Sequence, residues 1–151
     1  MINIETIKKK LNEFYDISWK WGVVVSWFEN ENTLSFCKGI IFSDEKISLN
    51  LHNIYTNYIL PNKKVKILVI DIITSIQEIK SVEELKKIDL LNEWIFVWDI
   101  KNDNGSFILP NTKWIDSIKK TLDTIKTKVK FSSKQVNIYK FSTKRYTFTQ
   151  W

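Results

Sequence analysis

The chain is poor in the residues on which metal and nucleophilic chemistry most often depends. Its 151 residues include one cysteine, Cys37, and one histidine, His52. Because a zinc ion needs three or four such ligands, the sequence predicts no metal site. A single cysteine also excludes an internal disulfide, which is typical of proteins of the reducing cytoplasm.

Glycine and proline are scarce as well, with three and two residues. The glycines stand alone at positions 22, 39 and 105, so there is no Gly-rich phosphate-binding loop and we expect no cofactor. No apolar run approaches the roughly 18–20 residues that cross a bilayer. The first residues do not combine a basic end with an apolar stretch, so the sequence predicts no signal peptide and no membrane partner.

Positive charge comes almost entirely from lysine, because Arg145 is the only arginine. The formal net charge is +6, and it is unevenly distributed. Residues 112–151 hold ten basic and two acidic residues, whereas residues 1–111 hold 13 basic and 15 acidic ones. This asymmetry predicts a basic C-terminal part that suits an anionic partner, with a solvated lysine-rich face as the alternative.

Hydrophobic periodicity predicts an α+β fold, in one domain over residues 1–151, with a mainly antiparallel sheet flanked by helices. Strands are expected at 21–28, 34–42, 65–73, 94–100, 106–109 and 136–141, the last continuing into 146–148 or pairing beside it. Helices are expected at 4–15, 47–58, 82–87 and 113–129. A capping box of Ser81 and Glu84 should begin the third helix, and the fourth should pack on the sheet.

The helix at 47–58 is expected from five apolar residues at helical spacing, Ile47, Leu51, Ile54, Tyr55 and Tyr58. Such spacing is typical of a helix with one apolar face. The alternation of apolar residues at 47, 49 and 51 leaves a strand open as the alternative.

Several segments match the pattern of a known family in order and spacing. They are 70–73 (IDII), 81–85 (SVEEL), 105–110 (GSFILP), 115–116 (ID) and 136–141 (VNIYKF), with weaker matches at 23–26 (VVVS) and 34–39 (LSFCKG). On these segments the chain resembles the AMME-region family, also called AmmeMemoRadiSam system protein A. The resemblance implies the α+β fold and a candidate surface, and it implies no reaction, because the family has no settled activity.

The segment 34–39 also departs from the family's L-R-G-C-I-G motif. Leu34, Cys37 and Gly39 match it, whereas 35, 36 and 38 are Ser, Phe and Lys. If that motif is catalytic in the family, this resemblance implies that the present chain has lost the activity.

Cys37 is nevertheless the first candidate for chemistry. A nucleophilic thiol needs a neighbouring base or cation, and His52 or Lys38 could serve if the helix at 47–58 folds back over the strand. The alternative is a small buried side chain, which is the common state of a free cysteine.

Aromatic residues are the second candidate. Trp94, Phe96 and Trp98 alternate along one predicted strand and therefore share one face. If these side chains are exposed, they form an aromatic patch that could bind a partner. If they are covered, they belong to a strand that is buried on both faces.

The C-terminal segment is the third candidate. Lys140, Lys144, Arg145 and Trp151 belong to a run that mixes cations with aromatic rings. Such surfaces bind single-stranded nucleic acid by stacking and phosphate neutralisation. The alternative is an edge strand whose lysines prevent aggregation.

We therefore expect a non-enzymatic protein-binding domain in the cytoplasm, which could serve as a toxin-neutralising immunity protein and whose basic charge suits an acidic partner surface. The expected partner-binding residues are Trp94, Phe96, Trp98, Trp151, Lys140, Lys144 and Arg145. The first alternative is a nucleic-acid-binding module built on the basic C-terminal part. The second is a divergent enzyme with a Cys37 nucleophile and His52 as its base.

Overall fold

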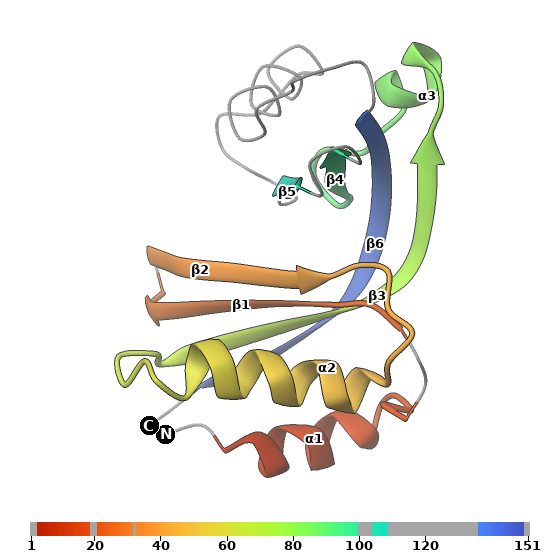
Figure 1. The fold of residues 1–151 in the computed structure, drawn as a ribbon. Coiled ribbons are helices and arrows are strands. Elements are labelled where there is room, and N and C mark those ends of the chain that lie inside the picture. Colours follow the sequence, from red (N-terminus) through yellow and green to blue (C-terminus); the bar gives the residue numbers. More distant parts are fainter. Residues whose placement is uncertain (1–2, 19–20, 32, 100–103, 109–135, 150–151) are drawn as a thin grey trace. The chain divides into compact units, whose positions relative to one another are not determined.

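The computed structural model describes residues 3–18, 21–31, 33–99, 104–108 and 136–149 (Figure 1). The helices are α1 (Ile4–Asn12), α2 (Ile47–Ile54), the π-helix η1 (Tyr55–Ile59) and α3 (Val82–Lys86). The strands are β1 (Val23–Asn30), β2 (Thr33–Ile40), β3 (Ile67–Ile79), β4 (Trp94–Asp99), β5 (Asn104–Ile108) and β6 (Val136–Thr149). The helix expected at 113–129 lies outside the described residues.

The strands form one six-stranded sheet in the order β2-β1-β3-β6-β4-β5. β1 pairs antiparallel with β2 and β3, and β4 pairs antiparallel with β5 and β6. The predicted α+β class with a mainly antiparallel sheet is confirmed. Residues 136–149 form a single strand, so the segment at 146–148 continues the strand that begins at Val136.

The chain divides into two compact units. Unit 1 consists of residues 1–73 and 144–151, and unit 2 consists of residues 74–143. Strands β3 and β6 each run from one unit into the other. The expectation of one domain over residues 1–151 stays a prediction.

The core of unit 1 lies between its strands and two helices, α1 and α2, which lie on the same side of β1 (Figure 1). Asn3 caps α1, since its side-chain oxygen accepts the backbone N–H of Glu5 at 2.8 Å. Ile7 and Leu11 of α1 then meet the strands. From α2 and β1, the same cluster contains Ile47, Leu51, Ile54, Val23, Val25 and Trp27.

The opposite face of β1 and β3 is buried as well. Val24, Val69 and Ile73 lie on it, together with two polar residues, Ser26 and Asp71. Strand β3 is therefore covered on both faces over its first part, which accounts for its continuous apolar sequence.

The helix that begins at Ile47 changes its hydrogen bonding at Tyr55. The backbone N–H of Leu60 donates to the carbonyl of Tyr55 at 2.8 Å, which is the i→i+5 bond of a π-helix. Ile47, Leu51, Ile54 and Tyr55 are buried as expected, but the next buried residue is Ile59. The wider turn places Tyr58 at the surface, although it belongs to the apolar spacing that predicted the helix.

In unit 2, the third helix begins as predicted. The Ser81 hydroxyl accepts the backbone N–H of Glu84 at 3.2 Å, and the Glu84 carboxylate accepts the backbone N–H of Lys80 at 2.8 Å. The carboxylate thus reaches one residue further back than the usual capping box. Leu85 of α3 packs with Ile95, Val97 and other residues on one face of β4.

The other face of β4 carries an aromatic cluster. Trp94 stacks on Phe141 at 5.4 Å, and Phe96 packs on Phe107 at 5.0 Å between ring centroids. The hairpin β4–β5 needs a glycine opposite this cluster, because a Cβ at Gly105 would lie 2.5 Å from a ring carbon of Phe96. Since Phe96 is held by its ring neighbours, it cannot move aside cheaply.

Candidate functional site

Exposed aromatic side chains gather at the β2 side of unit 1. Phe36 of β2 is 53% exposed and Tyr58 of η1 is 39% exposed. Both rings contact Trp27 of β1, with centroid distances of 5.4 Å for Phe36 and 6.1 Å for Tyr58. Trp27 itself is only 3% exposed, so it forms a fixed base between two accessible rings. We call Trp27, Phe36, Lys38 and Tyr58 the Trp27 patch.

Lys38 adds a positive charge to the Trp27 patch. Its ammonium nitrogen lies 5.7 Å from the centre of the Tyr58 ring, within the range of a cation–π contact. Phe36 and Lys38 are two residues apart on β2 and therefore point to the same face. The patch thus combines two apolar surfaces with one cation.

Strand geometry explains why Phe36 is accessible. In the part of the chain that the structure describes, β2 pairs with β1 alone and is an edge of the sheet. The register pairs Phe36 with Trp27 and then Leu34 with Phe28, so one residue of β2 has no counterpart on β1. Such a bulge bends an edge strand and limits edge-to-edge aggregation.

Cys37 and His52 are not brought together. Cys37 pairs with Ser26 and lies between Phe36 and Lys38, so its side chain points away from the face that α2 covers. His52 is an exposed residue of α2. The sheet separates the thiol from the imidazole, and the expected nucleophile–base pair does not form.

The three aromatic residues expected to bind a partner take part in the interior of unit 2. Trp94 and Phe96 are buried, and Trp98 is half-buried. Ile95 and Val97, on the other face of β4, are buried too. This placement matches the alternative interpretation, a strand covered on both sides.

The basic residues of β6 are mostly paired with carboxylates. Lys140 lies 3.4 Å from Glu93. The Arg145 guanidinium donates to both carboxylate oxygens of Asp71, at 3.1 and 3.2 Å. Lys144 is exposed, and Trp151 lies outside the described residues.

The Asp71–Arg145 pair is a feature that sequence reasoning missed. The Asp71 side chain is fully buried, whereas that of Arg145 is 52% exposed. A buried carboxylate requires a charged or hydrogen-bonding partner. The signal was present, because an aspartate interrupts the apolar run of β3 and the chain has one arginine.

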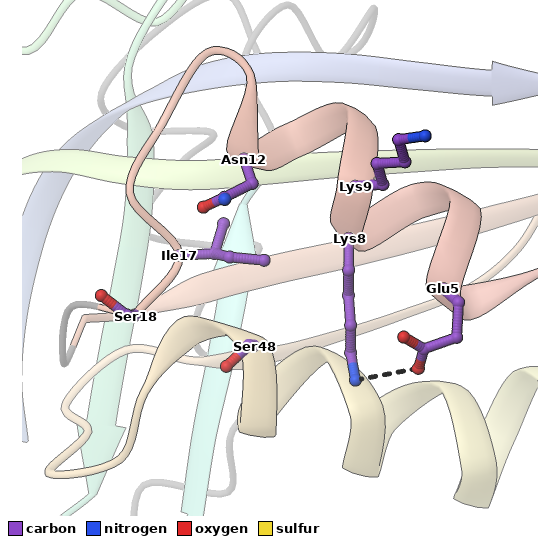
Figure 2. A pocket seen from close by; sticks show the side chains of 7 residues that line it. All are labelled: Glu5, Lys8, Lys9, Asn12, Ile17, Ser18 and Ser48. Atoms are coloured by element: carbon purple, nitrogen blue, oxygen red, sulfur yellow. Dashed lines mark hydrogen bonds and ion pairs between the residues drawn. The ribbon is translucent and has the colours of Figure 1, made fainter.

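A pocket of about 370 Å³ lies between α1 and the start of α2, and Figure 2 shows its lining. Lys8 extends from α1 and meets the Glu5 carboxylate at 3.3 Å, while Lys9 points away (Figure 2). The backbone N–H of Ser48, at the start of α2, donates to the carbonyl of Ile17 at 3.0 Å. Glu5 and Lys8 of this pocket are thus paired with each other.

Within the described ranges, no group of three or more His, Cys, Asp and Glu side chains could hold a metal ion. None of the described helices is both long and apolar enough to cross a bilayer.

Comparison with known proteins shows the fold and nothing further. No family model matches the chain, and no curated protein matches it. The chain is similar to the crystal structure of an uncharacterised protein from Pyrococcus horikoshii. The similarity has a TM-score of 0.66, with 16% identity over 87% of this chain and 75% of that one.

The residues of the Trp27 patch did not emerge as a partner-binding site from the sequence. Phe36 belongs to an expected strand and Tyr58 to an expected helix, and neither pattern predicts exposure. The edge position of β2 makes Phe36 accessible, and the π-turn makes Tyr58 accessible. One signal was available, because Phe36 and Lys38 are two of the positions that depart from the motif of the resembled family.

Proposed function

We propose that this chain is a non-enzymatic protein-binding domain and that the Trp27 patch is its contact surface. The observation that carries the proposal is the pair of exposed rings, Phe36 and Tyr58, held on the buried Trp27. Aromatic side chains with a rigid base lose little conformational entropy on binding, and they dominate the binding energy of many interfaces.

The other expected surfaces support the proposal less well. The aromatic residues of β4 are largely buried, and two of the three described basic residues of β6 already have carboxylate partners. An enzymatic role for Cys37 has less support, because His52, the expected base, lies on the other side of the sheet.

The finer form of the proposal is a cytoplasmic, dedicated partner such as a toxin-neutralising immunity protein. The single cysteine fits the reducing cytoplasm. The AMME-region resemblance belongs to this proposal too, since the patch uses positions at which the chain departs from that family's motif. Such departures suit a surface adapted to one partner.

The test is affinity capture with three forms of the chain as bait, in lysate of the source cells with and without nuclease treatment. They are the wild type, Phe36→Ser, and the matched control Leu91→Ser, which removes a 66% exposed apolar side chain from unit 2. We expect a protein that the wild type and the control retain equally. Loss of an interface hot spot should weaken its retention by Phe36→Ser on the order of tenfold or more.

Equal retention by Phe36→Ser would contradict the proposal, provided that circular dichroism shows this variant folded. Capture that disappears on nuclease treatment would instead favour the nucleic-acid-binding alternative. In that case binding should also fall steeply between low and moderate salt.

A further inference from the structure

The charge of Lys38 is not balanced by a carboxylate, in contrast to the charges of three other described cations. Lys8 meets Glu5, Lys140 meets Glu93 and Arg145 meets Asp71. Over the residues that the structure describes, Lys38 has the Tyr58 ring as its partner and no carboxylate. The ring orients the ammonium group and neutralises none of its charge.

The position of Lys38 relative to the rings limits what can bind there. Phe36 and Lys38 share one face of β2, and two residues of a strand span roughly 6.6 Å. One short segment of a partner can therefore cover the Phe36 ring and reach the ammonium group at the same time. The complementary segment has an apolar or aromatic side chain close to a carboxylate.

The surroundings of the patch favour a single carboxylate over a phosphate backbone. Glu29, near the end of β1, and Glu31, in the turn that leads to β2, are both exposed. A polyanion that lies along β2 would meet these like charges, whereas one carboxylate placed at Lys38 would not.

We propose that the Trp27 patch recognises a protein segment in which an Asp or Glu lies near an apolar or aromatic residue, with Lys38 receiving the carboxylate. This inference rests on the proposed function and specifies its partner. Lys38 supplies specificity and charge steering, while Phe36 and Tyr58 supply most of the affinity.

The test uses short random peptides displayed on phage and selected on the immobilised full chain. Wild type should enrich peptides in which an acidic residue lies near an apolar or aromatic one. Lys38→Met should lose the acidic preference while it still enriches apolar or aromatic residues, and Lys38→Arg should keep both. Phe36→Ser should enrich nothing above background.

The best acidic peptide is then titrated against each variant. We expect Lys38→Met to weaken binding by about threefold to tenfold, as for a partly exposed charge contact. The wild-type affinity should fall between about 50 and about 300 mM salt, and that of Lys38→Met should hardly change.

The outcomes separate this inference from the proposed function. Enriched apolar peptides without acidic preference, bound equally by Lys38→Met and lost in Phe36→Ser, would overturn the inference and leave the protein-binding function standing. Peptides bound equally by Phe36→Ser would count against the patch itself. Absence of any enrichment would overturn recognition of a single segment, and concentration-dependent self-association lost in Phe36→Ser would identify a second copy as the occupant.

Discussion

At the scale of single residues, Asp71 is the side chain whose placement most needs an explanation. It is fully buried in an otherwise apolar strand, and its charge is satisfied by the two hydrogen bonds from Arg145. A bidentate pair of this kind is more stabilising than a lysine–carboxylate contact, and it also fixes the relative orientation of the two groups. Arg145 therefore acts first on the fold, and its expected role in partner binding stays a prediction.

Replacing Arg145 with methionine should destabilise the protein by roughly 3 kcal/mol, the lower end for breaking a buried pair, because the guanidinium is half-exposed. The cause is the buried Asp71 carboxylate, which loses the two hydrogen bonds from the guanidinium. The midpoint of urea-induced unfolding measures the effect. Lys86→Met is the control, since its pair with Glu83 is exposed and should contribute about 0–1 kcal/mol.

A double variant tests the explanation. Asp71→Asn combined with Arg145→Met removes both charges, so it should recover part of the stability that Arg145→Met loses. An unfolding midpoint for Arg145→Met equal to that of Lys86→Met would show that the buried charge is not the cause.

At the scale of elements, periodicity predicted where strands and helices lie better than where they end. The apolar run at 65–73 predicted the buried part of β3, but the strand continues to Ile79. Its second half is mostly exposed, and β3 neighbours β6 in the sheet; the Thr74 hydroxyl donates to the Ser142 carbonyl at 3.2 Å. Hydrophobicity reports burial, so it could not show this extension.

The π-turn shows the same limit for the candidate site. The spacing of Ile47, Leu51, Ile54 and Tyr55 is that of an α-helix, and Tyr58 continues the same spacing. The i→i+5 bond at Tyr55 adds one residue to the turn, which brings Ile59 to the core and Tyr58 to the surface. No residue pattern in the sequence specifies that extra residue, so the patch could not be found from periodicity.

The turn between α3 and β4 yields a prediction about pH. The Asn92 amide and the backbone N–H of Leu91 donate to the Asp89 carboxylate and hold its pKa below the ordinary value of 3.8. A carboxylate with a lowered folded pKa stabilises the fold above its unfolded pKa, and this contribution is lost as pH falls through the folded pKa.

Asn92→Ala should therefore raise the pKa of Asp89 toward 3.8, because the largest cause of its lowering is removed. Carboxyl-carbon NMR titration of Asp89 measures the change. Asn62→Ala, at another turn, is the control and should leave the pKa of Asp89 unchanged. An unaltered Asp89 titration in Asn92→Ala would show that the backbone donors alone keep the pKa low.

At the scale of the whole molecule, unit 1 is made of two separate parts of the chain. Its second part begins at Lys144 and supplies Arg145, Tyr146 and Phe148. Tyr146 and Phe148 pack against the core of α1, α2 and the strands, and Tyr146 stacks on Phe14 at 5.9 Å. Sequence patterns showed these residues as strand residues and could not show which distant segments they complete.

Deletion of residues 144–151 should unfold unit 1. Burying one large apolar side chain is worth about 1.5–3 kcal/mol, and the total stability of a domain is only about 5–15 kcal/mol. Hydrogen exchange of the β1 and β3 amides should show the loss of protection. The exposed substitution Lys144→Ser is the control, and unaltered protection in the truncated chain would mean that unit 1 closes without its second part.

This divided arrangement also sets an order of events during translation. Asp71 and Arg145 are 74 residues apart, and all of unit 2 is synthesised between them. At typical rates of 5–20 residues per second, the ribosome takes about 4–15 s to produce the partner of Asp71. The earlier strands must wait with apolar surface uncovered, so the nascent chain should depend on chaperones during this interval, while unit 2, which is continuous, can fold as it emerges.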